Sequence, residues 1–316
     1  SWEDKFFHIG VSIGITPITE ATESAVSILS QADSACYAAK DRGRNRIHLY
    51  TVEDIELVQR TGEMEWVRQI NQALEESRFR LFCQPISAIE PGRDEKGHYE
   101  VLLRMINEEG GLVLPGKFFP AAERYHLASK IDQWVITTAF EWLRHHPDLL
   151  DHLSLCSINQ SGHSLGDAAF LEYVNREIEK TGIPGNKICF EITETAAIAN
   201  FASARRFITD LKERGCQFAL DDFGSGLCSF AYLRTLPVDF LKIDGVFIKG
   251  IVDDPVDLAM VKSINDMGHV LGKRTVAEFV DTQAILDKLS EIGIDYAQGF
   301  GIGRPRPLDE LTIVNC

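Results

Sequence analysis

The stretch Phe218-Ala219-Leu220-Asp221-Asp222 is a short apolar run that ends on two carboxylates. A run of this length, bounded by turn or helix signals, is typical of a buried parallel strand. Other runs of the same form each carry a carboxylate, an amide or a lysine at or near one end. They lie at residues 79–84, 99–104, 153–159, 188–194, 240–244, 275–278 and 296–299. Polar residues at the ends of eight buried strands predict a TIM-type (β/α)8 barrel, whose active site lies at the carboxyl ends of the strands.

The segments between these runs support the same fold. Helical patterns fill residues 129–144, 167–180, 201–214, 256–271 and 281–292. The gap at residues 85–97 differs, because it holds Pro91-Gly92 and Gly97 and shows no apolar periodicity. Without a crossover helix two strands do not pair in parallel, so we expect the first barrel strand to be antiparallel to the second. Residues 78–316 are also close to the roughly 250 residues of a typical TIM barrel.

The first fifty residues predict a small α/β fragment. Residues 6–16 and 46–50 have the pattern of strands, and residues 24–41 have the apolar stripe of an amphipathic helix. Such a fragment cannot bury its own sheet and must lean on another element. Residues 51–77 are helical in pattern. We therefore divide the chain into a fragment at 1–50, a connecting helical segment at 51–77 and a barrel at 78–316.

Composition limits the classes of partner. The net charge of −15 argues against binding to a polymeric nucleic acid, which needs a basic surface. No apolar stretch reaches the roughly 18 residues of a membrane span, and no signal-peptide pattern is present. The seven cysteines contain no C-x-x-C pair and most lie in apolar runs, which is typical of reduced core residues in a cytoplasmic protein.

The polar strand ends supply mainly oxygen ligands, which favour hard metal ions and metal-assisted hydrolysis. Neighbouring side chains of a strand point to opposite faces, so Asp221 and Asp222 reach one cleft only if the backbone leaves the strand there. Phe223-Gly224-Ser225-Gly226 can supply that departure. The alternative interpretation is an aspartate pair that caps a turn.

Several motifs in this order resemble those of the EAL domain, the cyclic-di-GMP phosphodiesterase family. The motifs are Glu100-Val101-Leu102-Leu103-Arg104, Glu191-Ile192-Thr193-Glu194, Asp221-Asp222-Phe223-Gly224, Leu241-Lys242-Ile243-Asp244 and Gln298-Gly299-Phe300. Residues 1–50, with Val11-Ser12-Ile13-Gly14 and Gly43-Arg44-Asn45-Arg46, resemble the C-terminal part of a GGDEF (diguanylate cyclase) domain. The signature loop that binds GTP is not in the chain, so we expect no synthesis of cyclic-di-GMP.

The resemblance implies hydrolysis of cyclic-di-GMP to linear 5'-pGpG with two Mg²⁺ or Mn²⁺ ions, in a barrel that pairs as a homodimer. It implies a metal-binding set of Glu100, Asn159, Glu191, Asp221 and Asp222. Asp221 would bridge the two ions, with Asp222 supporting the second. So many carboxylates would repel one another without cations, which is a physical reason to expect two ions.

The resemblance also implies three further catalytic residues: Lys242, which orients or deprotonates the attacking water, Glu278, which holds metal-bound water, and Glu194, which anchors the loop 222–229. It implies substrate contacts by Gln84, Arg104, Asp244 and Gln298. Alternative interpretations remain for several of these residues. Glu278 and Gln298 could be ordinary hydrogen-bonded strand ends, Arg104 could pair with Glu123, and Phe118 and Phe119 could belong to the core rather than to a base-stacking wall.

The chain departs from the family pattern at a few positions. Leu227-Cys228 replaces an aromatic-serine pair, Phe279 stands where glycine usually follows Ala-Glu, and Ile302-Gly303 is unusual. None of these removes a ligand. The rival functions are a catalytically weak or inactive EAL receptor that binds cyclic-di-GMP and signals to a partner, and an unrelated metallophosphoesterase on the same barrel. Receptors of that kind usually lose metal ligands, and this chain retains them all.

Overall fold

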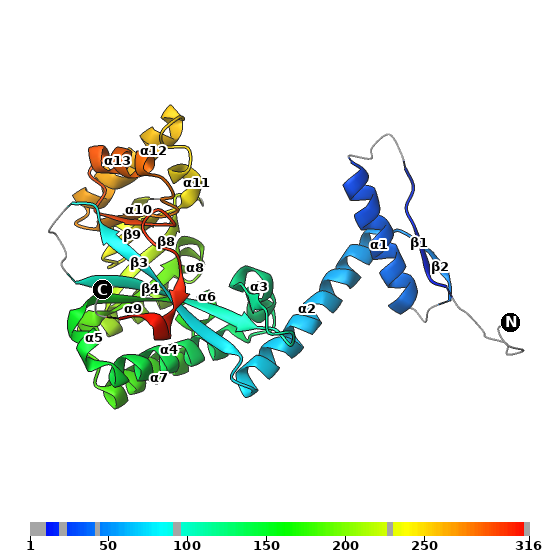
Figure 1. Cartoon of the computed structure of the whole chain (residues 1–316), viewed down its shortest axis with the longest axis horizontal. Helices are drawn as coiled ribbons and strands as arrows, with labels where there is room; N and C mark the ends of the chain where they lie inside the picture. The colour runs from blue at the N-terminus through cyan, green and yellow to red at the C-terminus, as the bar shows by residue number, and fades with distance from the viewer. Residues whose placement is uncertain (1–10, 19–23, 42–44, 91–95, 226–229, 313–316) are drawn as a thin grey trace, which may run out of the picture. The chain divides into compact units, whose positions relative to one another are not determined.

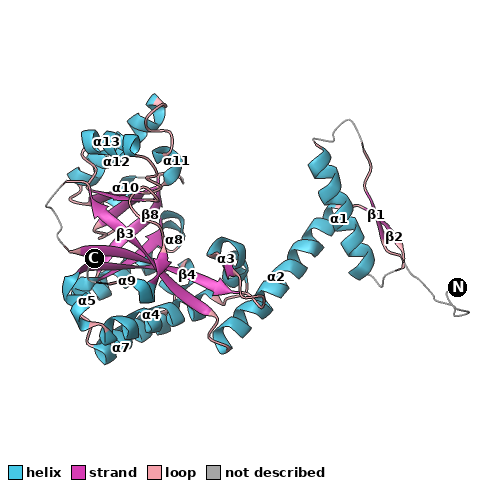
Figure 2. Ribbon diagram, viewed as in Figure 1, coloured by secondary structure: helices cyan, strands magenta, loops and turns pink. Residues whose placement is uncertain are grey.

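The computed structural model describes residues 11–18, 24–41, 45–90, 96–225 and 230–312. The chain forms two compact units, Ser1–Asn71 and Gln72–Cys316. Figure 1 traces both units along the chain, and Figure 2 shows their secondary structure. None of the helices within the described ranges has the length and apolar character needed to cross a membrane.

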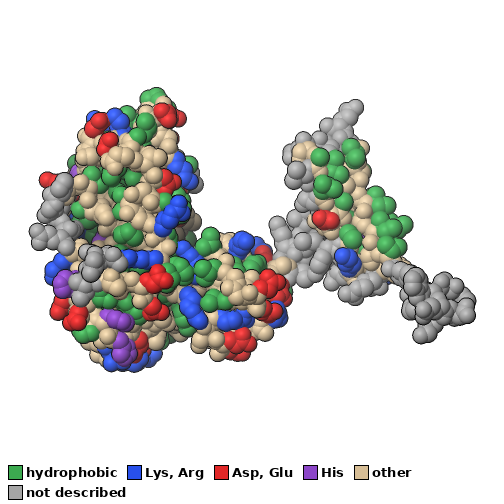
Figure 3. Space-filling view, viewed as in Figure 1, with side chains coloured by type: hydrophobic (Ala, Val, Ile, Leu, Met, Phe, Trp, Pro, Cys, Tyr) green, Lys and Arg blue, Asp and Glu red, His purple; other side chains and the backbone are tan. Residues whose placement is uncertain are grey.

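The N-terminal unit holds strands β1 (Ile13–Ile15) and β2 (Ile47–Leu49), which pair in parallel, and helix α1 (Ala25–Asp41), which lies between them in the sequence. The expected strand at 6–16 is confirmed only near its C-terminal end, at Ile13–Ile15, since residues 1–10 lie outside the described residues. Helix α1 packs on one side of this two-stranded sheet through Ala35, Ala38 and Ala39. Other apolar side chains of the strands stay exposed, as the green groups over β1 and β2 in Figure 3 show: Val11, Ile13, Ile15, Ile47 and Leu49. The unit therefore leaves an apolar sheet surface uncovered, as the sequence predicts. Helix α2 (Val52–Glu75) follows and fills most of the expected connecting segment.

The C-terminal unit contains a closed ring of eight strands, which confirms the predicted barrel. The ring runs in the order β3, β11, β10, β9, β8, β7, β6 and β4, and pairing between β3 and β4 closes it. The strands are β3 (Phe79–Ala88), β4 (Gly97–Ile106), β6 (Leu153–Gln160), β7 (Ile188–Thr193), β8 (Gln217–Phe223), β9 (Phe240–Ile243), β10 (Arg274–Ala277) and β11 (Tyr296–Gln298). The first strand, β3, is antiparallel to both of its neighbours, while the other ring pairs are parallel. The short strands β5 (Leu112–Val113) and β12 (Arg306–Pro307) pair with β4 and β3 outside the ring.

Helices cover the outside of the ring (Figure 1). The long ones match the predicted periodic segments within a few residues: α4 (Ala128–His145), α7 (Ala168–Thr181), α9 (Phe201–Glu213), α12 (Pro255–Val270) and α13 (Gln283–Ile292). The shorter ones are α3 (Pro115–Arg124), α5 (Pro147–His152), α6 (Gly162–Leu165), α8 (Glu194–Ala199), α10 (Phe230–Leu233) and α11 (Gly245–Ile248), with 3-10 turns η1 (Gly185–Lys187) and η2 (Leu308–Glu310). Short helices carry too few periodic residues for sequence patterns to reveal them.

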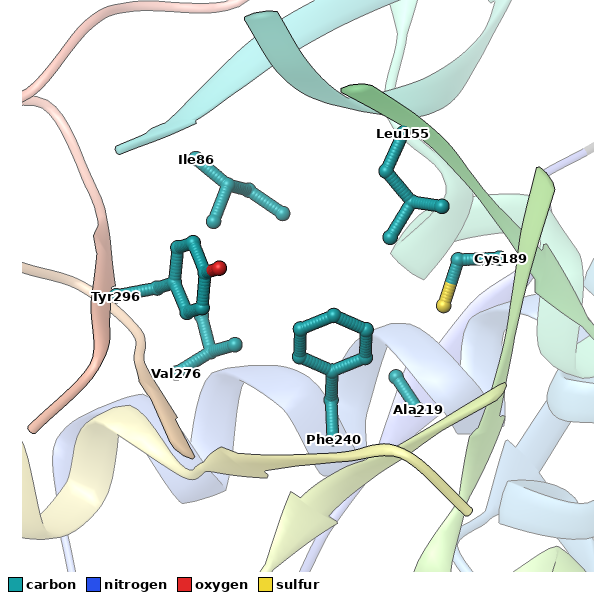
Figure 4. Close-up of a cluster of buried hydrophobic side chains, with 7 residues drawn as sticks. All are labelled: Ile86, Leu155, Cys189, Ala219, Phe240, Val276 and Tyr296. Atoms are coloured by element: carbon teal, nitrogen blue, oxygen red, sulfur yellow. The ribbon is translucent and has the colours of Figure 1, made fainter. Parts of the chain in front are cut away.

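The barrel interior is filled by one layer of packed side chains, shown in Figure 4. Seven strands each contribute one member: Ile86, Leu155, Cys189, Ala219, Phe240, Val276 and Tyr296. The ring of Phe240 lies 5.9 Å from that of Tyr296 in an edge contact. Buried His98 of β4 completes the layer beside both rings and exchanges a hydrogen bond with Ser157 Oγ (3.1 Å). This layer closes the barrel below the polar strand ends.

Candidate active site

The strand periodicity of two brings the polar residues together. Side chains at positions i and i+2 of a strand share a face. Two residues beyond Cys189, Phe240 and Val276 of the apolar layer stand Glu191, Lys242 and Glu278. The other strands obey the same rule and add Glu100, Ser157, Asp221 and Gln298, with Gln84 contributed by the antiparallel strand β3. The barrel therefore carries a polar layer directly above its apolar core.

Lys242 lies at the centre of this polar layer with only 1 % of its surface exposed. Its Nζ is within ion-pair distance of four carboxylates: 2.7 Å from Glu191, 2.9 Å from Glu278, 3.3 Å from Glu100 and 3.3 Å from Asp221. Four acidic groups around one ammonium leave an excess of negative charge in a buried place. Such an arrangement is costly for stability unless further cations share it.

The protonation states follow from this crowding. Burial alone would lower the pKa of Lys242, but the four carboxylates outweigh burial and hold it well above its usual value. A lysine that deprotonates water, one of the two roles the sequence implies for Lys242, needs a lowered pKa, and the side chains around the amine oppose this. Burial raises the pKa of Glu191 to about 8 and that of Glu278 well above its ordinary value. The pKa of Glu100 is lowered, because burial, which would raise it, is outweighed by Lys242 and by hydrogen bonds from two side-chain amides.

Asp221 and Asp222 do face one cleft, but the backbone turns earlier than predicted. Strand β8 continues to Phe223, and the departure occurs at Asp222 itself, whose φ of 53° lies in the left-handed region. The register between β8 and β9 shifts at the same point, between Leu220 and Phe223, which is the mark of a β-bulge. An aspartate tolerates this conformation better than most residues. The bulge thus re-aims the Asp222 carboxylate.

Three carboxylates of this region lie close enough to share one cation. Oxygen atoms of Asp221, Asp222 and Glu278 all lie within 4.8 Å of one another. Burial, followed by Asp221 and Asp244, raises the pKa of Asp222 to about 6. The sequence prediction gives Glu278 only a role in holding metal-bound water, whereas the geometry also allows direct coordination.

The donor set fits a hard divalent ion. Among the described residues, Gln298 Oε1 is buried without a hydrogen-bond partner, and Asp221 Oδ1 has no neighbour of opposite charge except Lys242 Nζ at 3.3 Å, which it shares with three other carboxylates. Buried oxygens that lack a full set of partners are uncommon, and a bound ion or water explains them. The neighbouring groups are carboxylates and amides, the ligands that Mg²⁺ and Mn²⁺ prefer. Asn159 lies at the edge of the cluster, where its Nδ2 donates to Glu100 Oε1 (2.6 Å).

Glu194 holds the turn that follows β8. Thr193 caps helix α8, and Glu194 begins that helix with a fully buried side chain. Its Oε2 accepts a hydrogen bond from the backbone N–H of Gly224 (3.1 Å), and its Oε1 accepts one from the hydroxyl of Tyr232. Glu194 is therefore a buried hydrogen-bond acceptor and not a solvent-exposed residue at the start of a helix. Leu227 and Cys228, where the chain departs from the family pattern, lie outside the described residues.

The predicted substrate-binding residues take different positions. Gln298 Nε2 donates to Glu100 Oε2 (2.5 Å) and to Gln84 Oε1 (3.3 Å), so both glutamines border the carboxylate cluster. Gln84 Nε2 donates to Gly303 O (2.9 Å). Asp244 caps helix α11 and accepts from Val246 N–H (2.9 Å).

Arg104 lies at the rim, two strand positions beyond Leu102 and four beyond Glu100 on the same face of β4. Its guanidinium stands 5.4 Å from the centre of the Phe82 ring and donates to Leu103 O (2.7 Å). Within the described ranges no ion pair joins Arg104 to Glu123, which is the alternative interpretation of this arginine. Phe118 is buried in the core, as the ordinary interpretation expects.

Two cavities flank Glu100 and Leu102 at the carboxyl ends of the strands. One, of about 250 Å³, is lined by Gln84, Glu100, Glu278, Phe279, Gln298 and Phe300. The other, of about 290 Å³, is lined on its apolar side by Leu102 and Phe119 and on its polar side by Asn159 and Gln160. Together they give the metal-ligand cluster room for a ligand with two large ends.

The sequence reasoning missed Asp132. This residue of helix α4 is buried and lines the second cavity, where its Oδ2 accepts from Ser161 N–H (3.0 Å), Ser161 Oγ (2.7 Å) and Ser164 Oγ (2.6 Å). Burial raises its pKa to about 6. A signal was available, because Asp132 stands between Ile131 and Val135 in an apolar stripe. A carboxylate is rarely buried in such a stripe unless it has polar partners.

The fold and these contacts define a (β/α)8 barrel with a buried lysine–carboxylate cluster at the carboxyl ends of its strands. The family model described as the EAL domain matches residues 67–305, and the chain belongs to this family.

Relatives support the same assignment. The chain is 45% identical over 301 residues to "Cyclic di-GMP phosphodiesterase PdeB" of Shewanella oneidensis, a match that covers 95% of this chain and 34% of that protein. It is 31% identical over 303 residues to "Bifunctional diguanylate cyclase/cyclic di-GMP phosphodiesterase MucR" of Pseudomonas aeruginosa, covering 96% and 44%. The solved structure "PaMucR Phosphodiesterase, c-di-GMP complex" is 30% identical with a TM-score of 0.72, covering 78% of this chain and all of that one (100%). The chain thus spans between a third and a half of the length of these two curated relatives.

Proposed function

We propose that the barrel hydrolyses one phosphodiester bond of cyclic di-GMP to give linear 5'-pGpG. The observation that carries the proposal is the buried cluster of oxygen donors around Lys242, in which every ligand implied by the family motifs is present. The names of the relatives support the choice of substrate. The two cavities on either side of the cluster suit a cyclic dinucleotide, whose two bases lie on opposite sides of a phosphate-containing ring.

Two divalent ions, Mg²⁺ or Mn²⁺, would be held by the carboxylates and Asn159. Glu100, Asn159, Glu191 and Asp221 would form one site, and Asp221 with Asp222 the other, with Glu278 close enough to assist. Ions bound in this way supply Lewis acidity that polarises a phosphate and lowers the pKa of water. The excess of carboxylates over the single ammonium of Lys242, and the buried Gln298 Oε1 without a hydrogen-bond partner, support this assignment.

Lys242 serves as a hydrogen-bond donor that aims the nucleophile. Its raised pKa keeps the amine protonated at neutral pH. A protonated lysine cannot accept a proton, and the raised pKa values of Glu191 and Glu278 leave these two carboxyl groups largely protonated at neutral pH as well. Cations bound beside them would favour their ionised form, and an ionised Glu278 could then take the proton of the attacking water.

The remaining side chains position the substrate and the ligands. Gln84 and Gln298 border the cluster and can contact the dinucleotide, and Arg104 at the rim can donate to a phosphate oxygen. Asp244 helps by fixing the start of α11 next to Lys242. Glu194 anchors the turn that presents Asp222, through its contact with Gly224.

The decisive experiment is incubation with cyclic di-GMP, with Mg²⁺ or Mn²⁺ and with EDTA, followed by nucleotide chromatography. We expect 5'-pGpG only with metal. Binding of cyclic di-GMP without turnover under any metal would identify a receptor. Turnover of other phosphodiesters but not of cyclic di-GMP would identify a different phosphoesterase.

We also propose that residues 1–50 are the C-terminal part of a GGDEF-like domain, that 51–77 connect it to the barrel at 78–316, and that the barrel forms a homodimer. The exposed apolar face of β1 and β2 supports the first point, because a complete domain would cover it. Sedimentation equilibrium tests the dimer. Saturable GTP binding by this chain would contradict the assignment of 1–50 as a catalytically silent fragment.

A further inference from the structure

Phe279 has a backbone conformation that aromatic residues rarely adopt. Its φ is 54°, in the left-handed region that favours glycine. It directly follows Glu278, at the turn after strand β10. The backbone at this position gains nothing from a phenylalanine, since glycine would fit with less strain. A strained backbone conformation at Phe279, next to Glu278 of the candidate site, indicates that the phenylalanine side chain has a function there.

The Phe279 ring is held in place by the turn after strand β9. A Cβ atom built on Gly245 would lie only 2.2 Å from Phe279 Cδ2, so the ring rests directly on the backbone of Gly245. The ammonium of Lys249 stands 4.4 Å from the ring centre, in a cation–π contact. Any side chain at position 245 would displace the ring. The ring is therefore fixed by a close approach that only glycine allows.

The same ring forms a wall of the cavity beside the carboxylate cluster. Phe279 and Phe300 line this cavity, and both remain more than half exposed, at 51 % and 55 %. Glu100, Glu278 and Gln298 line it as well. An exposed aromatic ring that is fixed beside polar groups offers the surface on which a nucleobase stacks.

We propose that Phe279 is a specificity-determining residue that stacks one purine base of the substrate in this cavity. The inference rests on the proposed function and adds to it a contact at a position where the chain departs from its family pattern. Stacking takes place on a base remote from the bond that breaks. It stabilises the bound substrate and the transition state alike, so its loss raises KM and leaves kcat nearly unchanged.

The test compares Phe279→Gly, Phe279→Ala and Phe279→Tyr with the wild type in cyclic di-GMP hydrolysis. Glycine relieves the backbone strain and alanine retains it, but both remove the ring. We expect both to raise KM by roughly 5- to 100-fold, the range for loss of one base–aromatic stack, with kcat within about twofold. Tyrosine keeps the ring and should keep KM within about threefold. Thermal melting checks folding, and the glycine variant should melt no lower than the alanine variant.

A second readout does not depend on turnover. In Phe279→Trp, rapid mixing with cyclic di-GMP should quench the fluorescence of the new indole through contact with a guanine, beyond any change in the wild type. A wild-type KM in the glycine and alanine variants, or unquenched fluorescence in a tryptophan variant that hydrolyses normally, overturns the inference. So does a rise in KM in the alanine variant alone, because the glycine variant would then show that loss of the ring does not weaken binding. Failure of the wild type to hydrolyse cyclic di-GMP would instead remove the proposed function.

Discussion

The two layers of side chains inside the barrel come from the same strands, two residues apart, and differ in what they contribute. On β7 and β9 the apolar layer holds Cys189 and Phe240, while the polar layer holds Glu191 and Lys242. The lower layer removes apolar surface from water at a gain of roughly 25 cal/mol per Å². The upper layer buries four carboxylates around a single ammonium, which costs desolvation energy that their mutual contacts do not fully offset.

The apolar layer stabilises the fold, and the polar layer carries the proposed function. A residue of the lower layer can be replaced only at the expense of packing. A carboxylate of the upper layer can be removed with little loss of packing, and its removal relieves charge repulsion. Local violations of good packing are expected at functional sites, and the polar layer is such a place.

Asp221→Ala and Phe240→Ala should change activity and stability in opposite ways. Asp221→Ala removes the proposed bridging ligand and should abolish hydrolysis, while the metal-free protein should unfold at an equal or higher denaturant concentration. Phe240→Ala should lower the free energy of unfolding by about 3–5 kcal/mol through the cavity it leaves. Chromatographic assays and urea unfolding in EDTA measure both.

The exposed Asp287→Ala on α13 is the matched control and should alter neither property. More than a tenth of wild-type turnover in Asp221→Ala at saturating Mg²⁺ would show that this carboxylate is not a metal ligand. A clear loss of metal-free stability in that variant would contradict the contrast between the layers.

Lys242→Ala should reduce turnover by roughly 10²-fold or more, because it removes the group that aims the nucleophile. Calorimetry should still detect binding of cyclic di-GMP. The folded state raises the pKa of Lys242, so its charge contributes stability that is fully present below its unfolded pKa of about 10.4. At pH 7 the metal-free variant should therefore be less stable than the wild type. Lost dinucleotide binding would move Lys242 to a role in anchoring the ligand.

Glu194→Gln should have an intermediate effect. Glutamine replaces one of the two carboxylate oxygens by an NH2 group, so it cannot accept from Gly224 and from Tyr232 through two separate oxygens as Glu194 does. We expect slower hydrolysis and a higher Mg²⁺ concentration for half-maximal rate, since the turn that presents Asp222 is held less firmly. Wild-type rates across a Mg²⁺ titration would exclude the anchoring role.

Asp132→Asn should give the smallest effect, confined to the pH dependence of stability. Burial raises the pKa of Asp132 to about 6, above its unfolded value of about 3.9. The folded state thus binds this proton more tightly, and its contribution to stability falls as pH rises from about 4 to about 6. Asparagine can still accept from Ser161 and Ser164 and does not ionise.

Comparison of wild type and Asp132→Asn by urea unfolding in EDTA should therefore show a difference that changes by on the order of 2–3 kcal/mol between pH 4 and pH 7. The two proteins should be most alike at the acidic end. A difference that does not vary with pH would show that the buried carboxyl does not titrate in this range.

Much of the fold could be predicted because its signals are local. The runs around Phe240 and Phe218 are long enough to mark strands, and the missing helix at 85–97 is enough to predict the antiparallel first strand, which the pairing of Gln84 with Glu100 confirms. Short helices such as α8 and α11 escaped because one turn carries no periodicity. The left-handed turn at Asp222 escaped because the glycines after it are the stronger turn signal.

The sequence by itself determined which side chains share the barrel interior, because a strand alternates its faces with a period of two whatever surrounds it. It therefore determined that Glu191, Lys242 and Glu278 face the same space. Only the tertiary structure decided that Lys242 is enclosed by four carboxylates, and that the Phe279 ring rests on Gly245. Distances between strands, and the electrostatic fields that set each pKa, depend on how the ring of strands closes, and closure is a property of all eight strands together.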